Sequence, residues 1–299
     1  MNRLDITSIK DKYQACSMSA IRYEHIVQWN YPLEFRVRVL GGKNMSFEVL
    51  IDIVEKYWPM FLRGAGTTLY ISITGTIIGT FIGLLIGIIR TIPMPVKGVK
   101  RGLLKVVNGL LAFYIEFFRG TPMIVQSMVI YYGLAQAFDI HLNKIVAAIF
   151  IVSINTGAYM AEIVRGGIVS VDKGQFEAAQ AIGMNHVKTM KNVVLPQVIR
   201  NILPATGNEF VINIKDTSVL NVISVSELFF NAKSIAGSTY MYFEPFAVAC
   251  VLYFAMTVII TRILRFIEKK LDGPDNFVMI GNQMQVETPE SKLKREHSR

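Results

Sequence analysis

The sequence predicts an all-α polytopic membrane protein with about five transmembrane helices, its N-terminus outside and its C-terminus inside. Of the 299 residues, 52% are hydrophobic and only 18% are charged, with a mean hydropathy of +0.40. Soluble domains usually carry about 25% charged residues. The apolar residues also gather in blocks long enough to cross a hydrocarbon core of about 30 Å.

The five expected spans are apolar blocks at residues 61–89, 122–138, 145–164, 202–223 and 245–261. Between the first two, residues 106–118 are apolar but short. If this segment crossed the membrane, Arg119 and the preceding basic cluster would face opposite sides, against the charge rule. We therefore expect an interfacial or half-buried helix there.

The second span follows Arg119-Gly120-Thr121-Pro122. Threonine is a good helix N-cap, and proline is tolerated at the first helical position. Thr121 is therefore expected to cap this helix and Pro122 to begin it.

The basic residues set the orientation. Lys and Arg concentrate in residues 90–119, in residues 165–200 and after residue 262, whereas the two connections on the opposite side carry only Lys144 and Lys233. Basic loops stay on the cytoplasmic side. The net charge of +9 thus reflects membrane topology, and we do not expect nucleic-acid binding.

The N-terminal 44 residues do not fit this topology, because they are rich in Lys and Arg and lack the apolar core of a signal peptide. We expect Met45 to be the true start, with residues 1–44 an extension. Residues 45–272 would form one transmembrane domain, and residues 273–299 a flexible cytoplasmic tail.

The first span carries glycines at every fourth position, namely Gly75, Gly79, Gly83 and Gly87. This spacing places all four on one helix face. Small residues on a membrane helix let another backbone approach closely. We expect this face to pack against a second helix.

The long basic segment between the third and fourth spans is predicted to form two short helices. Asp172 can cap the first helix with Gln175 in a capping-box-like pattern, and Gly183 would end it. Asn185 can cap a second helix, expected to run to Leu195. The first helix offers a small apolar face that could lie in a partner's groove, made of Phe176, Ala179, Ala181 and Ile182.

This segment resembles the EAA loop of bacterial ABC importer permeases. The resemblance rests on Glu177-Ala178-Ala179, then Gly183, then Val193-Val194-Leu195-Pro196. The family usually has isoleucine at the position of Val193.

The likeness extends over about residues 45–272 and favours the polar amino-acid subfamily (histidine, glutamine and glutamate type). Three further segments carry it: Glu116-Phe117-Phe118-Arg119-Gly120-Thr121-Pro122, Ala158-Tyr159-Met160-Ala161-Glu162-Ile163-Val164-Arg165-Gly166-Gly167, and Lys215-Asp216-Thr217-Ser218-Val219-Leu220.

The resemblance implies a multi-pass permease of the bacterial inner (plasma) membrane. It implies that the loop docks into cytoplasmic ABC ATPase subunits through coupling residues Glu177, Ala178, Ala179 and Gly183. It further implies an extracytoplasmic amino-acid-binding protein and a second permease copy or paralogue. The chain has no G-x-x-x-x-G-K-[ST] phosphate loop, so ATP and Mg²⁺ are expected on the partner ATPase and no cofactor in this chain.

Two polar stripes inside the expected spans are candidates for the substrate pathway. One consists of Asn155, Tyr159 and Glu162, and the other of Glu209, Asn213 and Asp216. Each set has helical spacing. Polar groups in membrane helices usually face the bundle interior or a cavity. Interhelical hydrogen bonds, or positions near the cytoplasmic interface, remain open as alternatives.

Two other function classes are possible for a polytopic membrane protein, a secondary carrier and a membrane enzyme. An ion-gradient-driven secondary amino-acid carrier commonly contains internal repeats, and none is evident. A membrane enzyme or metal protein is not indicated, so no catalytic or metal-binding residue is expected. The histidines are scattered and the two cysteines lie far apart: His25, His141, His186, His297, Cys16 and Cys250.

Overall fold

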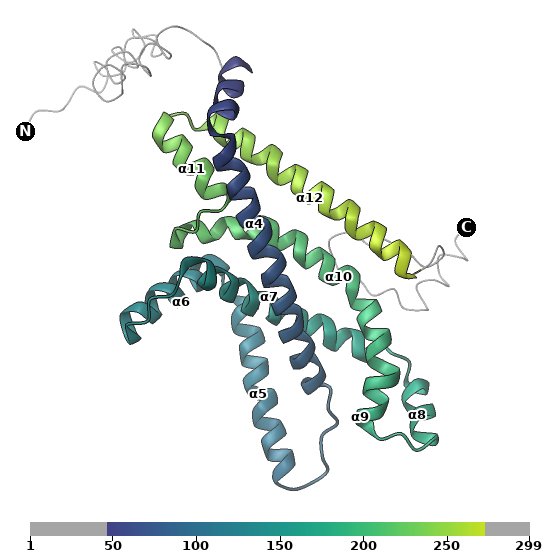
Figure 1. Ribbon diagram of the computed structural model, residues 1–299. Coiled ribbons are helices and arrows are strands. Elements are labelled where there is room, and N and C mark those ends of the chain that lie inside the picture. Colours follow the sequence, from purple (N-terminus) through teal and green to yellow (C-terminus); the bar gives the residue numbers. More distant parts are fainter. Residues whose placement is uncertain (1–46, 273–299) are drawn as a thin grey trace, which may run out of the picture. The chain divides into compact units, whose positions relative to one another are not determined.

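The computed structural model describes residues 47–272, and every regular element in this part of the chain is a helix (Figure 1). In chain order the elements are α4 (Phe47–Arg90), α5 (Val99–Gly120), α6 (Met123–Phe138), α7 (Lys144–Val169), α8 (Lys173–Ala181), α9 (His186–Thr189), the π-helical η1 (Met190–Val194), α10 (Leu195–Asp216), the 3₁₀-helical η2 (Thr217–Ile223), α11 (Leu228–Thr239) and α12 (Phe243–Asp272). The predicted extension 1–44, the start at Met45 and the tail 273–299 lie outside the described residues.

Three helical segments are long and apolar enough to cross a membrane: Glu48–Arg90, Lys144–Val169 and Phe243–Lys270. A fourth candidate arises if His186–Ile223 and Leu228–Thr239 form one bent span. Helix α6 is apolar but shorter. The prediction of an all-α, polytopic membrane protein is therefore confirmed at this level.

Helix α4 begins well before the predicted start of the first span. The apolar block opens at residue 61, but the helix opens at Phe47 and has 44 residues, or about 66 Å at 1.5 Å per residue. In its first turns Val49 and Ile53 are buried, while Glu48 and Asp52 are exposed. Charged residues thus end the apolar block without ending the amphipathic helix.

The described residues divide into two compact units. The first comprises residues 47–71, 127–148 and 215–255, and the second comprises residues 72–126, 149–214 and 256–272. Several helices continue from one unit into the other. Each unit is described by itself below.

In the second unit, the glycine face of α4 lies directly against α7. A Cβ atom at Gly75 would lie 2.5 Å from Val152 Cγ1, and one at Gly79 2.6 Å from Thr156 Cβ. One at Gly83 would lie 2.7 Å from the Met160 carbonyl carbon, and one at Gly87 2.6 Å from Val164 Cγ1. The contacted residues are themselves four apart, so two helical rows face each other with no room for side chains on α4.

Helix α5 is half-buried within the same unit, beside the C-terminal part of α4 (Figure 1). Its buried face packs with α4 and α7 in one cluster containing Leu111, Tyr114, Ile115, Ile82, Ile86 and Ala161. The Tyr114 hydroxyl donates a hydrogen bond to the Ile154 carbonyl at 2.5 Å. The opposite face of α5 is exposed and apolar, with Leu103, Val106, Leu110 and Phe113.

The first unit contains a helix that the sequence analysis missed. Between the expected spans 202–223 and 245–261 only a connection is expected, but α11 occupies Leu228–Thr239 and buries Leu228, Ala232 and Ile235. The fully buried Glu227 caps this helix, accepting hydrogen bonds from the Phe229 and Phe230 amides at 2.9 and 2.6 Å. A carboxylate satisfies the unpaired amides at a helix N-terminus.

Helix α4 approaches α11 closely in this unit. Asn231 donates to the Met60 carbonyl at 2.9 Å, and the Leu228 amide donates to the Thr68 hydroxyl at 3.3 Å. A Cβ atom at Gly64 would lie 2.9 Å from the Leu228 Cα atom. Gly64 is therefore the fifth glycine of α4 that permits a close helix contact.

Candidate functional site

The EAA-like loop folds into α8 and α9 through the predicted caps. The Asp172 carboxylate accepts from the Gly174 amide at 2.7 Å, and the Asn185 side chain accepts from the Lys188 amide at 2.9 Å. Gly183 has a φ of +80°, and its amide donates to Gln180 O. Glycine adopts this left-handed conformation without the steric cost that other residues meet.

The second helix of the loop does not end at Leu195, as the following Pro196 had suggested. Helix α9 passes through η1 directly into α10, which contains Pro196. The Leu195 amide donates to the Met190 carbonyl, five residues back. A proline removes one amide and crowds the carbonyl four residues earlier. The wider π turn falls at this point, and the helix continues through the proline.

Helix α8 is held to its own chain by one side and exposed on the other. Ala179 is buried, and Phe176 packs against a core of α7, η1 and α10 residues. Ala181 and Ile182, expected on the same face, are exposed. Ala181 lies on another face because it is five positions from residue 176, and Ile182 is the C-cap residue that follows the last helical residue.

The exposed side of the loop defines a candidate docking surface. Of the four expected coupling residues, Glu177, Ala178 and Gly183 are exposed, whereas Ala179 is not. Two large apolar side chains join them, since Ile182 is 79% exposed and Val187 is 71% exposed. Apolar side chains projecting from short capped helices suit a partner's groove.

The core beneath the loop joins it to the long helices. The buried cluster consists of Met160, Val164, Ile168, Val171, Met190, Val194, Val198 and Ile202, with Leu84 and Ile88 of α4 packed against it. Gly167 lets α10 come close to α7, since a Cβ atom there would lie 3.0 Å from Ile202. The loop, α7, α10 and the end of α4 therefore share one buried core.

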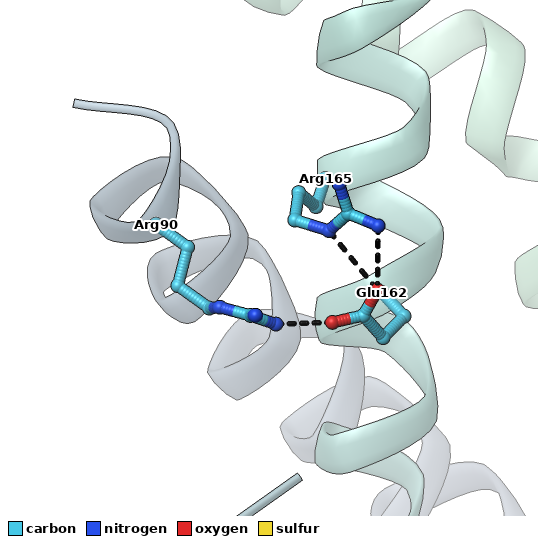
Figure 2. A network of polar contacts seen from close by, with 3 residues as sticks. All are labelled: Arg90, Glu162 and Arg165. Atoms are coloured by element: carbon cyan, nitrogen blue, oxygen red, sulfur yellow. Dashed lines mark hydrogen bonds and ion pairs between the residues drawn. The ribbon is translucent and has the colours of Figure 1, made fainter. Parts of the chain in front are cut away.

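An ion-pair network joins the end of α4 to α7 (Figure 2). The Arg90 guanidinium at the end of α4 donates to one oxygen of Glu162. Arg165 donates to the other oxygen through Nε at 3.0 Å and Nη2 at 2.9 Å. Glu162, a candidate pathway residue, is thus engaged between two arginines.

The other two residues of that stripe lie at the junction between α5 and α6. The Asn155 amide donates to Gln126 Oε1 at 3.0 Å and to the Phe118 carbonyl at 3.3 Å. The Arg119 guanidinium lies 5.4 Å from the centre of the Tyr159 ring, which is a cation–π distance. Because Asn155 is near the middle of α7, the break between α5 and α6 lies at mid-helix depth.

At this junction the Thr121 side chain does not form the N-cap hydrogen bond that was expected. Its hydroxyl donates to the Phe117 carbonyl at 2.8 Å and accepts from Gln126 Nε2 at 2.8 Å. The Val125 and Gln126 amides instead bond to the Pro122 carbonyl, and α6 begins at Met123. Thr121 therefore closes α5 rather than capping α6.

The second stripe divides into a buried and an accessible part. Asn213 is 4% exposed, and it donates to the hydroxyls of Thr76 at 2.8 Å and Thr156 at 2.9 Å. These hydrogen bonds join α4, α7 and α10. They agree with the alternative that Asn213 forms interhelical hydrogen bonds and does not line the substrate pathway. Glu209 is partly exposed and Asp216 is exposed on the same helix.

Several contributors to this arrangement were not singled out from the sequence: Arg90, Arg165, Gln126, Thr76, Thr156 and Glu227. Thr76 lies three residues before Gly79 and Thr156 three residues before Tyr159, so helical spacing places each threonine near a noted residue, but their contact with Asn213 is not local. Arg165 lies three residues after Glu162 and could have been found from helical spacing, whereas Arg90 is 72 positions away and carries no local signal. Within residues 47–272, no group of three or more His, Cys, Asp or Glu side chains could hold a metal ion.

Comparison with known families gives an independent result. Residues 83–273 match the family described as "Binding-protein-dependent transport system inner membrane component". The arginine transport system permease protein ArtQ of Bacillus subtilis is 33% identical over 78% of this chain and 100% of its own length. The glutamine transport system permease protein GlnP of Escherichia coli is 37% identical over 71% of this chain and 93% of its own.

Solved structures agree with the sequence comparison. A crystal structure of an amino acid ABC transporter with histidines contains a chain that is 36% identical, with a TM-score of 0.64. The match covers 76% of this chain and 99% of that one. A chain from the MetNI methionine ABC transporter in an inward-facing conformation has a TM-score of 0.62 at 17% identity, which shows a shared fold.

Proposed function

Because the chain belongs to the family of binding-protein-dependent transport system inner membrane components, we propose that it is the membrane permease of an ATP-driven amino-acid importer. Relatives named for arginine and glutamine transport support amino acids as the substrate class. The exposed α8 surface above a core continuous with α4, α7 and α10 carries the proposal. A permease of this family is a multi-pass inner-membrane subunit, and ATP hydrolysis belongs to partner subunits.

In the proposed complex, cytoplasmic ATPase subunits receive α8 through Glu177, Ala178 and Gly183, together with Ile182 and Val187. ATP and Mg²⁺ bind on the ATPase, and this chain holds no cofactor. An extracytoplasmic binding protein delivers the amino acid, and a second permease copy or paralogue completes the pathway. Ala179 serves to seat the helix, because it is buried in its own chain.

The proposed topology has five crossings. Helix α6, with 16 residues, is about 24 Å long and falls short of a bilayer core of about 30 Å. The α5–α6 break lies beside Asn155, near the middle of α7. We therefore take α5 and α6 as one broken crossing. The other four crossings are α4, α7, the α10–α11 pair and α12. The N-terminal end then lies outside, and the coupling loop and C-terminus lie inside, as the basic residues demand.

We propose two parts of the pathway, each within one unit: the α5–α6 break with Asn155, Tyr159 and Arg119 together with the partly exposed Glu209 in the second unit, and the exposed Asp216 in the first. Discontinuous helices near mid-membrane commonly form transport sites. Glu162 and Asn213 are assigned instead to holding the helices together. Asp216→Asn is expected to lower uptake while the ATPase still co-purifies. Unchanged uptake would remove Asp216 from the pathway.

Co-purification tests the proposed complex. The tagged chain is isolated from its native membrane in mild detergent, beside the double variant Glu177→Lys, Gly183→Trp. A P-loop ATPase is expected with the wild type and not with the variant. The matched control is Asp139→Lys, Gly237→Trp, which makes the same charge reversal and the same glycine-to-tryptophan change at exposed or open positions outside the loop and should retain the ATPase.

The outcome also separates the two transport classes. An ion-gradient-driven secondary carrier is not favoured, because the matched family consists of binding-protein-dependent systems. If the chain emerges without an ATPase and reconstituted vesicles still accumulate amino acid from an ion gradient alone, the importer proposal fails.

A further inference from the structure

The connection between α4 and α5, together with the first turns of α5, forms a compact basic and apolar surface. This surface, called here the basic hairpin, comprises residues 90–105 and lies at the end of the α4 span (Figure 1). It contains Arg90, Lys97, Lys100, Arg101 and Lys105 and no Asp or Glu. Arg90 is occupied by Glu162. Among the described residues, Lys97, Lys100 and Lys105 form no ion pair and are exposed.

Large apolar side chains project from the same surface. Val96 is 81% exposed and Val99 is 89% exposed, and Ile92, Met94 and Leu103 are also exposed. The requirement for positive residues on one side of a membrane explains the lysines but not these side chains. An exposed apolar patch rimmed by charge marks an interaction surface.

The chain fixes the shape of the hairpin. Pro93 and Pro95 each hold their own φ angle near −65°. Gly98 has a φ of +99°, which reverses the chain into α5. The Arg101 guanidinium donates to the Val96 carbonyl at 2.8 Å. Val96 and Lys97 are therefore presented on a constrained turn.

The first turns of α5 are amphipathic. Val99, Leu103 and Val106 are spaced four and three apart and share one face. Arg101 and Lys105 are four apart and lie on the opposite side. The apolar face continues into the exposed Leu110 and Phe113 farther along α5. At the start of a crossing helix, this arrangement places the apolar side chains among acyl chains while the flexible basic side chains reach the headgroups.

We propose that the basic hairpin is a binding surface for anionic phospholipid headgroups. Val96, Val99 and Leu103 would enter the acyl boundary, while Lys97, Lys100 and Lys105 reach lipid phosphates with their flexible stems. The proposal requires only that α4 crosses the membrane, so it stands independently of the coupling to an ATPase. The hairpin would fix the depth of α4 and α5, and with it the level of the coupling core.

The test measures lipid retention by the full-length purified chain. Native mass spectrometry counts bound phosphatidylglycerol or phosphatidylcholine in the wild type and in the triple variant Lys97→Gln, Lys100→Gln, Lys105→Gln. The matched control is the triple variant Lys173→Gln, Lys188→Gln, Lys191→Gln, which removes the same charge from exposed positions in the coupling loop.

The wild type and the control are expected to bind phosphatidylglycerol in preference to phosphatidylcholine. In the hairpin variant, phosphatidylglycerol affinity should fall about fivefold for each lysine removed, since a basic residue near an anionic surface contributes about 1 kcal/mol. The preference should also weaken with added salt. Equal phosphatidylglycerol binding by the wild type and the hairpin variant would overturn the proposal.

A second measurement tests the apolar contact. Val96→Trp is made in a chain whose own tryptophans are replaced by phenylalanine, and the chain is reconstituted without any ATPase in vesicles containing brominated phosphatidylglycerol. Quenching of the new tryptophan by the brominated lipid is expected. Unquenched emission typical of water would contradict membrane contact, and shielding that arises only when the ATPase is added would assign the surface to that protein instead.

Discussion

Replacing Gly83 by alanine tests the closest helix contact in the structure. A Cβ atom at this position would lie 2.7 Å from the Met160 carbonyl carbon and 2.8 Å from the Ala161 amide nitrogen. Both contacts are to backbone, so no side-chain rotation can relieve them, and α4 must move away from α7. Overpacking of this kind typically costs about 1–3 kcal/mol.

The matched control is Gly66→Ala in the same helix, where a Cβ atom would meet nothing within 4 Å. Alanine is favoured over glycine in a helix by about 1 kcal/mol. For a chain of this size, 1 kcal/mol shifts the melting temperature by about 2–4 °C. Both substitutions gain this propensity, so we expect Gly66→Ala to leave the apparent melting temperature unchanged or raise it by a few degrees, and Gly83→Ala to melt about 2–12 °C below Gly66→Ala.

The assay is size-exclusion chromatography of the fluorescently tagged chain after heating in detergent, which reports the fraction still monodisperse. Gly75→Ala, Gly79→Ala and Gly87→Ala should behave like Gly83→Ala. If Gly83→Ala and Gly66→Ala have the same melting temperature, α4 and α7 do not approach as closely as described, and the glycine row has no packing role.

Three further substitutions test individual interactions, each by the same melting assay. Glu162→Gln should lower stability by about 1–2 kcal/mol, between the values for exposed and buried ion pairs, and a lack of effect would show that the network is not formed in the membrane. Asn213→Leu should cost about 0.6–1.7 kcal/mol, the range for hydrogen bonds between membrane helices, and a gain in stability would contradict the buried hydrogen-bond node. Glu227→Ala should cost about 1–2 kcal/mol as a lost N-cap and should increase protease cleavage within α11, whereas unaltered cleavage would argue against the cap.

Local patterns in the sequence predicted the parts of the structure that depend on local chemistry. Asp172, Gly183 and Asn185 have the cap geometry that their residue types favour. The polytopic, all-helical class follows from apolar blocks whose length is set by the bilayer. Such features depend on the backbone within a few residues, so one sequence carries them.

Features that depend on distant partners were not predictable in this way. Glu162 was noted as a polar residue in a span, but its partner Arg90 is 72 positions away. Asn213 was likewise noted as a polar residue in a span, but its hydrogen-bond partner Thr76 is 137 positions away. Helix α11 was not expected because it has only 12 residues and mixes Asn231 and Lys233 with its apolar side chains, so it is too short and too polar to stand out as a span.

The coupling loop gives two examples of features that local residue patterns do not predict. The motif directed attention to Glu177, Ala178 and Ala179 together, but only the fold distinguishes exposed Ala178 from buried Ala179. The helix continues through Pro196 by way of a π turn, and residue preferences do not predict such a turn. Proline in the sequence indicates a cost to the helix, and the surrounding packing decides whether the helix ends.

The most direct test of the central claim uses this one-residue difference. Ala178→Cys and Ala179→Cys are made separately in a chain whose native cysteines are replaced by serine, and each is labelled in membranes with a short thiol-reactive photocrosslinker. We predict that position 178 captures a P-loop ATPase and that position 179 does not, because its side chain faces its own core. Capture of no ATPase from position 178, or equal capture from both positions, would contradict the account of α8 as the surface through which ATP hydrolysis drives import.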